Sequence, residues 1–193
     1  MRLFTAIELP AEVRNHLSGI QTYLQTPSHE IQGVKWVEPA NLHVTLKFFG
    51  EIEEGRLWEL QDALKTVHVE AMPLFADRFI RLPARGPARV LAAEIGGDAG
   101  GVAQLVERIE LAVEPMGFER EHRPFRAHVT LGRARDGVRL RVEGGLGHDD
   151  PLFRLDLSRQ FPGPSFETSS FTLFKSTLTT SGPVYESLMR FSP

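Results

Sequence analysis

The pattern of hydrophobic and polar positions along the chain predicts short strands interleaved with amphipathic helices. Residues 3–9 are rich in β-forming residues and end at Pro10, whose fixed φ angle suits the first turn of a helix. Beyond Pro10, apolar residues recur at spacings of four, three and four, which predicts a helix that ends before Pro27. These apolar positions are Val13, Leu17, Ile20 and Leu24.

Two more helices are predicted by the same spacing of apolar residues. One covers residues 57–67 and has acidic residues near its amino-terminal end, and the other covers residues 102–113 after two glycines. Residues 81–89 contain two prolines and a glycine, which predicts a loop. Strand-like runs occupy residues 34–37, 42–50, 90–95, 126–133, 152–157 and 166–178, and residues 137–147 are rich in glycine.

This order of elements favours an α+β fold with antiparallel sheets over a doubly wound parallel sheet. The chain has 193 residues, of which 41% are hydrophobic and 24% charged, as is typical of a soluble globular domain. No change in composition indicates a linker. We therefore interpret residues 1–193 as a single domain composed of two lobes.

Charge and composition exclude several classes of function. A formal net charge of -3 provides no general positive field for a long polyanion, so any nucleic acid must be bound locally. The absence of cysteine excludes disulfides, thiolate metal sites and a cysteine nucleophile. Residues 1–10 lack the apolar run of a signal peptide, and no segment approaches the roughly 20 apolar residues of a membrane span. We expect a cytoplasmic protein that does not bind membranes.

Two of the seven histidines begin the same four-residue motif, His-Val-Thr-Leu, within strand-like runs. Side chains alternate across a strand, so the histidine and threonine of each copy share one face, and the valine and leucine share the other. The polar pairs are His43 with Thr45 and His128 with Thr130. One such pair is common in strands, but two copies indicate an active site in which the pairs face each other across a cleft.

The residue types in these motifs suit phosphoryl transfer. Histidine has a pKa of roughly 6.5, so one imidazole of a pair can accept a proton while the other donates one near neutral pH. Threonine hydroxyls can donate hydrogen bonds to the non-bridging oxygens of a phosphate. This chemistry requires neither a metal ion nor another cofactor, and we expect none.

The duplicated motif and its flanking residues resemble the two-histidine phosphoesterase family, and within it the bacterial RNA 2′,3′-cyclic phosphodiesterases. The segments that carry this resemblance are RLFTAIELP, KWVEPANLHVTLKFFGE, FRAHVTLGRAR and SGPVYESL. The resemblance implies two pseudo-symmetric lobes, each an antiparallel sheet with helices packed outside, and an active site in the cleft between them. The chain departs from many relatives at Ala127, where they have proline.

The resemblance also implies the reaction and the roles of the motif residues. A terminal 2′,3′-cyclic phosphate on RNA, or on a nucleotide, would be hydrolysed to a 2′-phosphomonoester by a monomeric enzyme. His43 would protonate the leaving oxygen, His128 would activate water, and Thr45 and Thr130 would bind the phosphate. The residues leave open a phosphodiesterase for free cyclic nucleotides or 2′-5′ linkages, a reversible 2′-5′ RNA ligase, and an RNA-end binding protein without turnover.

Two cations near the motifs are further candidates for binding the phosphate. Arg133 follows the second motif at a position where relatives often have arginine, and a guanidinium can clamp phosphate oxygens. Strict alternation places Arg133 opposite His128, so it reaches the cleft only if the strand bulges or ends. Lys47 shares the parity of His43 and is predicted to face the cleft, although a solvated strand lysine is an equal alternative.

Three other features have a structural and a functional interpretation. Alternation directs Phe49 toward the cleft, where it could stack on a base, and Phe48 toward the core. Residues 120–126 hold three arginines that could contact RNA phosphates or form an ordinary solvated loop. Residues 148–150, His-Asp-Asp, lie in a glycine-rich segment without the further ligands of a metal site, so no metal is expected there.

Overall fold

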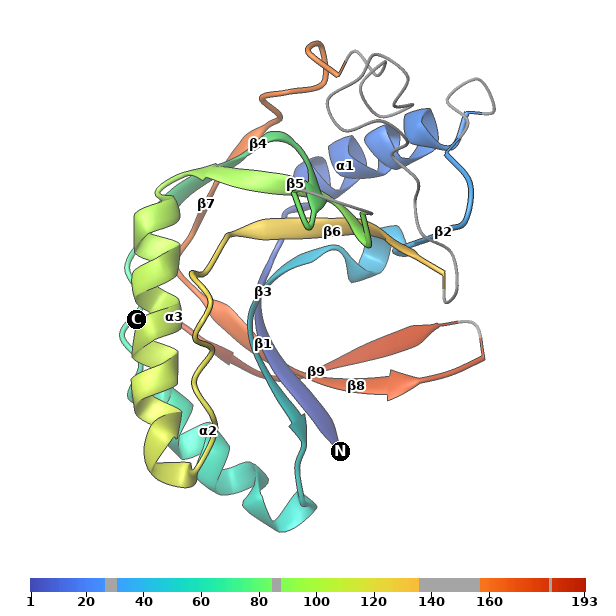
Figure 1. Ribbon diagram of the computed structural model, residues 1–193. Helices are drawn as coiled ribbons and strands as arrows, with labels where there is room; N and C mark the ends of the chain where they lie inside the picture. The colour runs from blue at the N-terminus through green and yellow to red at the C-terminus, as the bar shows by residue number, and fades with distance from the viewer. Residues whose placement is uncertain (27–30, 85–87, 136–156, 181) are drawn as a thin grey trace.

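The computed structural model describes residues 1–26, 31–84, 88–135, 157–180 and 182–193 (Figure 1). Within these residues nine strands form one sheet in which every paired strand is antiparallel. The strands follow the order β7-β4-β5-β6-β3-β1-β8-β9, and β2 pairs with β6. The predicted α+β class with antiparallel pairing is confirmed.

The helices and strands follow the predicted order, with two additional strands. The elements are β1 (Arg2–Glu8), α1 (Ala11–Leu24), β2 (Val34–Trp36), η2 (Pro39–Asn41), β3 (His43–Glu51), η3 (Glu54–Arg56), α2 (Leu57–Lys65), β4 (Met72–Leu82), β5 (Val90–Gly97), α3 (Ala99–Val113), η4 (Glu114–Met116), β6 (His128–Ala134), β7 (Ser165–Thr168), β8 (Phe171–Leu178) and β9 (Pro183–Phe191). None of these helices is long and apolar enough to cross a membrane.

The sequence patterns missed β4 and β9, and they merged β7 with β8. In β4 the pairing with β5 shifts register between Ala76 and Arg78, and such an irregularity interrupts the alternation by which a strand is recognised. In β9, which ends the sheet, only Phe191 is buried, so the strand has little apolar alternation to detect. The strand predicted over residues 152–157 lies outside the described residues except for Leu157.

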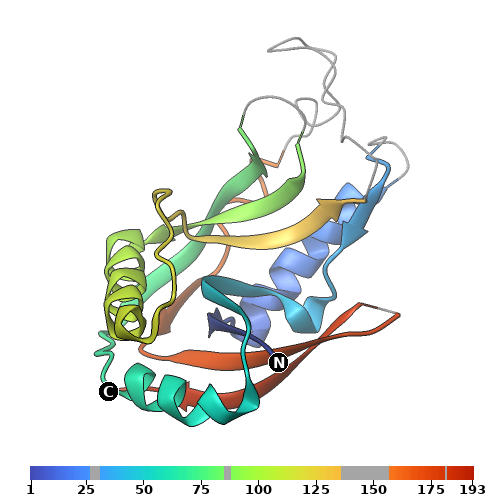
Figure 2. The same cartoon turned by 60° about the horizontal axis from the view of Figure 1, so that its bottom comes forward.

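The two halves of the chain are arranged alike around the centre of the sheet. There, β3 and β6 meet through one residue pair, Val44 with Val129. On either side a strand and a helix precede the motif strand: β1 and α1 precede β3 in one half, with β2 inserted after the helix, and β5 and α3 precede β6 in the other. Figures 1 and 2 show the sheet curving from β4 and β5, through β6 and β3, to the β8–β9 hairpin. The two implied lobes are thus two parts of one continuous sheet.

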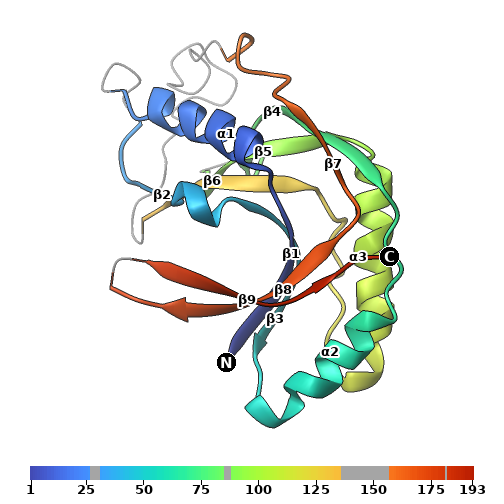
Figure 3. The same ribbon diagram turned by 180° about the vertical axis from the view of Figure 1, so that it is seen from behind.

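Helices α1 and α3 each extend to the opposite half. Gln21 of α1 donates a hydrogen bond to a carbonyl of β6, and α3 contacts β3 and lies against α2 (Figures 1 and 3). The apolar faces predicted for these helices are buried between helix and sheet. In α1 the buried apolar residues are Val13, Leu17, Ile20 and Leu24, and in α3 they are Val102, Leu105, Val106, Ile109 and Val113.

Candidate active site

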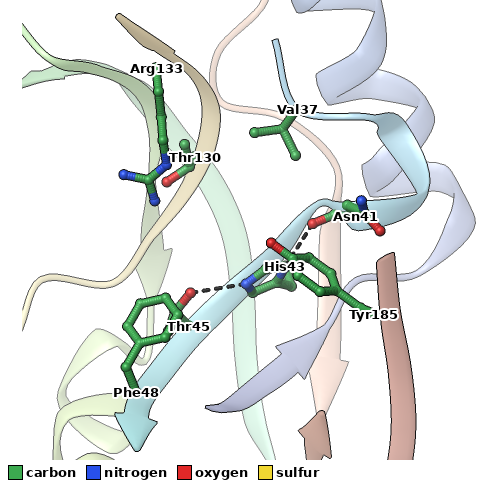
Figure 4. Close-up of a pocket in the computed structure, with 8 residues that line it drawn as sticks. All are labelled: Val37, Asn41, His43, Thr45, Phe48, Thr130, Arg133 and Tyr185. Atoms are coloured by element: carbon green, nitrogen blue, oxygen red, sulfur yellow. Dashed lines mark hydrogen bonds between the residues drawn. The ribbon is translucent and has the colours of Figure 1, made fainter. Parts of the chain in front are cut away.

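A pocket opens where the two motif strands meet, and three distant segments of the chain contribute to it (Figure 4). Its lining residues are Val37, Asn41, His43, Thr45, Phe48, Thr130, Arg133 and Tyr185. Three of them, Val37, Asn41 and Tyr185, were not predicted from the sequence, although each lies in a segment that carries the family resemblance. That resemblance was the available signal, since their positions in strands and turns show no distinctive periodicity.

The two motif histidines are held in the same way. The Nδ1 atom of His43 is 2.7 Å from the carbonyl oxygen of Asn41, and Nδ1 of His128 is 2.7 Å from that of Arg126. A carbonyl oxygen only accepts hydrogen bonds, so Nδ1 carries the proton in both rings and Nε2 is left for proton transfer. In the first motif Nε2 of His43 lies 3.0 Å from the hydroxyl oxygen of Thr45.

The pairing of the motif strands brings their polar residues to one place. Because Val44 pairs with Val129 in antiparallel fashion, His43 and Thr130 are neighbours across the strands, as are Thr45 and His128. His128 does not belong to the lining of the pocket, but its charge reaches His43. The two polar pairs therefore lie together on one face at the centre of the sheet.

The pKa of His43 is lowered from its usual value of 6.5. Burial is the main cause, because it disfavours the charged imidazolium. The hydrogen bond to the Asn41 carbonyl acts in the opposite direction, and the positive charges of Arg133 and His128 lower the pKa further. In the free protein the neutral form of His43 is thus favoured more than in an exposed histidine.

A β-bulge directs Arg133 into the pocket. In β6, Thr130 lies opposite Ala92 and Gly132 lies opposite Leu91, so Leu131 is an extra residue in the strand. The extra residue reverses the alternation that follows, which turns Arg133 to the face of Thr130. Arg133 lines the pocket, as Figure 4 shows. Arg133 was expected to reach the cleft only if its strand bulged or ended, and the strand does contain a bulge.

The same irregularity in β3 overturns the prediction for Lys47. Thr45 lies opposite Ala6 and Lys47 opposite Thr5, so Leu46 is the extra residue. Lys47 consequently faces the helices, where Nζ lies 2.7 Å from a carboxylate oxygen of Glu110 and 2.9 Å from a backbone oxygen. The prediction that Lys47 faces the cleft is wrong, because strict alternation does not hold across the bulge.

The bulge also exchanges the orientations predicted for the two phenylalanines. Phe48 is 65% exposed and lines the pocket, whereas Phe49 is 8% exposed and packs against Phe118. The predicted orientations were therefore reversed. An aromatic side chain does face the cleft from this strand, but it is the first phenylalanine and not the second.

Comparison with known proteins identifies the family. A family model described as LigT like Phosphoesterase matches residues 7–92 and 97–185, which include both motifs. The chain belongs to this family. The resemblance noted in the sequence is confirmed.

Relatives of this LigT-like phosphoesterase match it over nearly its whole length. An Archaeoglobus fulgidus protein named RNA 2′,3′-cyclic phosphodiesterase is 30% identical and covers 99% of each chain. A Thermus thermophilus protein of the same name is 35% identical over 100% of this chain and 90% of its own. A crystal structure of a Thermus thermophilus protein superposes with a TM-score of 0.76 at 30% identity, covering 100% of this chain and 97% of that one. Escherichia coli LigT in complex with 3′-AMP gives 0.73 at 25% identity, covering 99% and 97%.

Aromatic rings form one wall of the pocket in this LigT-like phosphoesterase. Phe4 is buried beneath the pocket, with its ring centre 5.0 Å from that of His43 and 4.9 Å from that of Tyr185. Tyr185 also meets His43 edge to face at 5.4 Å. Burial raises the pKa of Tyr185, so its hydroxyl stays protonated and can donate a hydrogen bond.

The arginines before the second motif are engaged with carboxylates. Arg120 pairs with Glu107, Arg123 with Glu121, and Arg126 with Glu94. Hydrogen bonds from Arg123 lower the pKa of Glu121 to about 2. These pairs offset the positive charge of residues 120–126, which agrees with the solvated-loop interpretation.

The remaining predicted feature was the His-Asp-Asp segment at residues 148–150, which lies outside the described residues. Among the residues that the structure describes, no three histidine, aspartate or glutamate side chains are grouped closely enough to hold a metal ion.

Proposed function

We propose that this protein is a phosphodiesterase that hydrolyses the terminal 2′,3′-cyclic phosphate of RNA to a 2′-phosphomonoester. The observation that carries the proposal is the antiparallel pairing of the two His-Val-Thr-Leu motifs beside Arg133. It groups two histidines, two hydroxyls and a guanidinium, which together can exchange protons with a phosphodiester and bind its oxygens. The names of the relatives support the same reaction.

In the proposed reaction His128 and His43 act as base and acid through their Nε2 atoms. Nε2 of His128 removes a proton from water as the water oxygen forms a bond to phosphorus. The bond between phosphorus and the 3′ oxygen breaks, and the Nε2 proton of His43 passes to that oxygen. The product carries a 2′-phosphate, and proton exchange with solvent restores both histidines.

Three side chains are proposed to bind the non-bridging oxygens as negative charge develops on them. Thr45 and Thr130 each provide a hydroxyl donor, and Arg133 provides a planar guanidinium that can donate two parallel hydrogen bonds. Lys47 has no part in this proposal, because its ammonium group is buried against Glu110.

The lowered pKa of His43 gives the bound phosphate a second role. In the free protein, burial and the charge of Arg133 disfavour the protonated acid form. A phosphodiester anion placed beside Arg133 offsets that charge and attracts the proton of His43. Binding of the substrate is therefore expected to raise the pKa of His43, which favours the protonated form that acts as the acid in catalysis.

The direct test uses an oligonucleotide that ends in a 2′,3′-cyclic phosphate, incubated with the protein in EDTA, with the phosphate position of the product mapped. We expect a 2′-phosphate product, and we expect its formation to be largely lost in His43→Ala and His128→Ala. His68→Ala is the matched control, because this side chain is 66% exposed and belongs to neither motif. A 3′-phosphate product, or turnover that returns only with added divalent metal, would contradict the proposal. Free adenosine 2′,3′-cyclic phosphate, tested in parallel, reports whether RNA is required.

We also propose that the protein acts as a monomer in the cytoplasm. Both motif histidines lie on paired strands of the same chain, so one copy supplies the acid and the base of the proposed reaction. A chain of 193 residues without cysteine forms no disulfides, so its fold does not require an oxidising compartment. Light scattering during size-exclusion chromatography tests the first statement, and cell fractionation tests the second.

A further inference from the structure

Helices α1 and α3 each bury one polar side chain at the same place in an otherwise apolar face. Gln21 is 3% exposed and Glu110 is 5% exposed. Each is the fourth residue from the carboxyl-terminal end of its helix. Each buried apolar residue of α1 has a buried apolar counterpart in α3, Val13 with Val102, Leu17 with Val106, Ile20 with Ile109 and Leu24 with Val113, whereas Leu105 of α3 corresponds to His16. Gln21 and Glu110 are therefore equivalent positions in the two halves of the fold.

Both side chains reach the bulge in the motif strand of the opposite half. The Nε2 atom of Gln21 donates to the carbonyl of Leu131, the extra residue of β6, at 2.8 Å. In the other half a carboxylate oxygen of Glu110 accepts from Lys47, which directly follows the extra residue of β3, at 2.7 Å. Two equivalent helix positions thus bond to two equivalent bulges.

The residue that follows the extra residue of each bulge explains why Gln21 and Glu110 differ chemically. In β3 this residue is Lys47, whose buried ammonium requires a carboxylate. In β6 it is Gly132, where an added Cβ atom would lie 2.5 Å from a side-chain carbon of Val34 on β2. Since β2 occupies that space, the helix partner in this half can bond only to the backbone, for which the amide of Gln21 is suited.

Gln21 also connects the bulge to another wall of the pocket. Its Nε2 atom donates a second hydrogen bond, at 2.7 Å, to the carbonyl of Val37, and the N–H group of Val37 donates to the carbonyl of Leu131 at 2.9 Å. Val37 and Arg133 both line the pocket, whereas Gln21 does not. One buried amide therefore holds together the backbones that present two of the lining residues.

We infer that Gln21 and Glu110 are positioning residues, which stabilise the two bulges and thereby direct Arg133 and Phe48 into the pocket. Without an extra residue in the strand, alternation would turn both side chains away from the motif threonines. Neither helix residue lines the pocket. The catalytic consequence rests on the proposed function, whereas the control of side-chain direction follows from the fold.

The test for Gln21 is a double-mutant cycle with Arg133, measured as kcat/KM on the cyclic-phosphate oligonucleotide. Gln21→Met keeps the length of the side chain but removes both donors, and we expect kcat/KM to fall roughly ten- to a hundredfold as Arg133 loses its position. In the Arg133→Ala background the same change is expected to cost about twofold or less, because nothing remains to be positioned. A purely structural role predicts equal losses in both backgrounds, which would overturn the inference.

A control variant and a binding measurement separate this inference from the proposed function. Gln25→Met is the control, since Gln25 is exposed just beyond α1 and donates to the backbone of Gln21. Binding of adenosine 2′-monophosphate, measured by calorimetry, should weaken in Gln21→Met and not in Gln25→Met. If the wild-type protein shows no turnover, the proposed function fails while this binding result still tests the positioning. Equal binding by all three proteins would overturn the inference.

Two further variants keep the test decisive. If Gln21→Met does not fold, Gln21→Asn retains an amide that is too short to reach both carbonyls, and the same loss of kcat/KM is expected. For the other half, Phe48 lines the pocket and is inferred to contact the bound nucleotide. Glu110→Gln should therefore raise KM in the wild-type background and leave it unchanged in Phe48→Ala. An equal increase in KM in both backgrounds contradicts the role assigned to Glu110.

Discussion

Removal of one partner of the Lys47–Glu110 pair is expected to destabilise the fold far more than removal of both. The two side chains are each 6% exposed and their charged atoms are 2.7 Å apart. Lys47→Met leaves the carboxylate buried without its cation, and Glu110→Leu leaves the ammonium without its anion. Breaking a buried pair in this way typically costs about 3–5 kcal/mol. Domains of this kind are stable by about 5–15 kcal/mol, so either change consumes a large part of the total.

The double variant, Lys47→Met with Glu110→Leu, distinguishes charge from packing. Replacing both members of a buried pair by apolar residues of similar volume is often neutral or stabilising by about 1–4 kcal/mol, so most of the lost stability should return. The assay is urea denaturation followed by circular dichroism, with unchanged m-values required for the comparison. The control is Lys65→Met, which removes a pair whose partners are 55% and 61% exposed and should change stability by less than about 1 kcal/mol. Single variants at Lys47 or Glu110 that behave like this control would refute the reasoning.

Further predictions concern the proposed active site. Burial and neighbouring cations lower the pKa of His43, so its ring should titrate below 6.5 by NMR in the free protein and at a higher pH once phosphate is added; equal titration in both states would show that the anion does not reach it. The alkaline limb of each pH profile reports the loss of the proton from His43. The limb of kcat/KM reflects the free protein and that of kcat reflects the substrate complex, so kcat/KM should decline at a lower pH than kcat. His43→Ala and His128→Ala should each cost roughly 10²–10⁴-fold in kcat, with the double variant little worse than either, and near-additive losses would show that the two do not act as a unit. An ester whose leaving group needs no protonation should rescue His43→Ala and not His128→Ala; the reverse result exchanges the two roles. Arg133→Lys should recover only part of the activity lost in Arg133→Ala, since an ammonium cannot form two parallel bonds, and full recovery would exclude bidentate binding.

The sequence by itself was sufficient for features that depend on neighbours along the chain. Apolar spacing located the three helices and their buried faces, because a helix must direct its apolar side chains to one side whatever lies opposite. Alternation placed His43 with Thr45, and His128 with Thr130, on the polar face of their strands for the same local reason. The repetition of the motif singled out the strands that meet at the centre of the sheet.

Features that depend on partners distant in the sequence were decided only by the tertiary structure. Alternation assigns Lys47 to the cleft and Arg133 to the core side, and both assignments are reversed by one extra residue in each motif strand. Whether a strand contains a bulge depends on its register with β1 or β5 and on the polar groups of the helices that bond to the residues at the bulge. Here the carboxylate of Glu110 accepts a hydrogen bond from the ammonium of Lys47, and the amide of Gln21 donates one to the carbonyl of Leu131. A local pattern carries no information about these contacts, because the helices that provide them come from the opposite half of the chain.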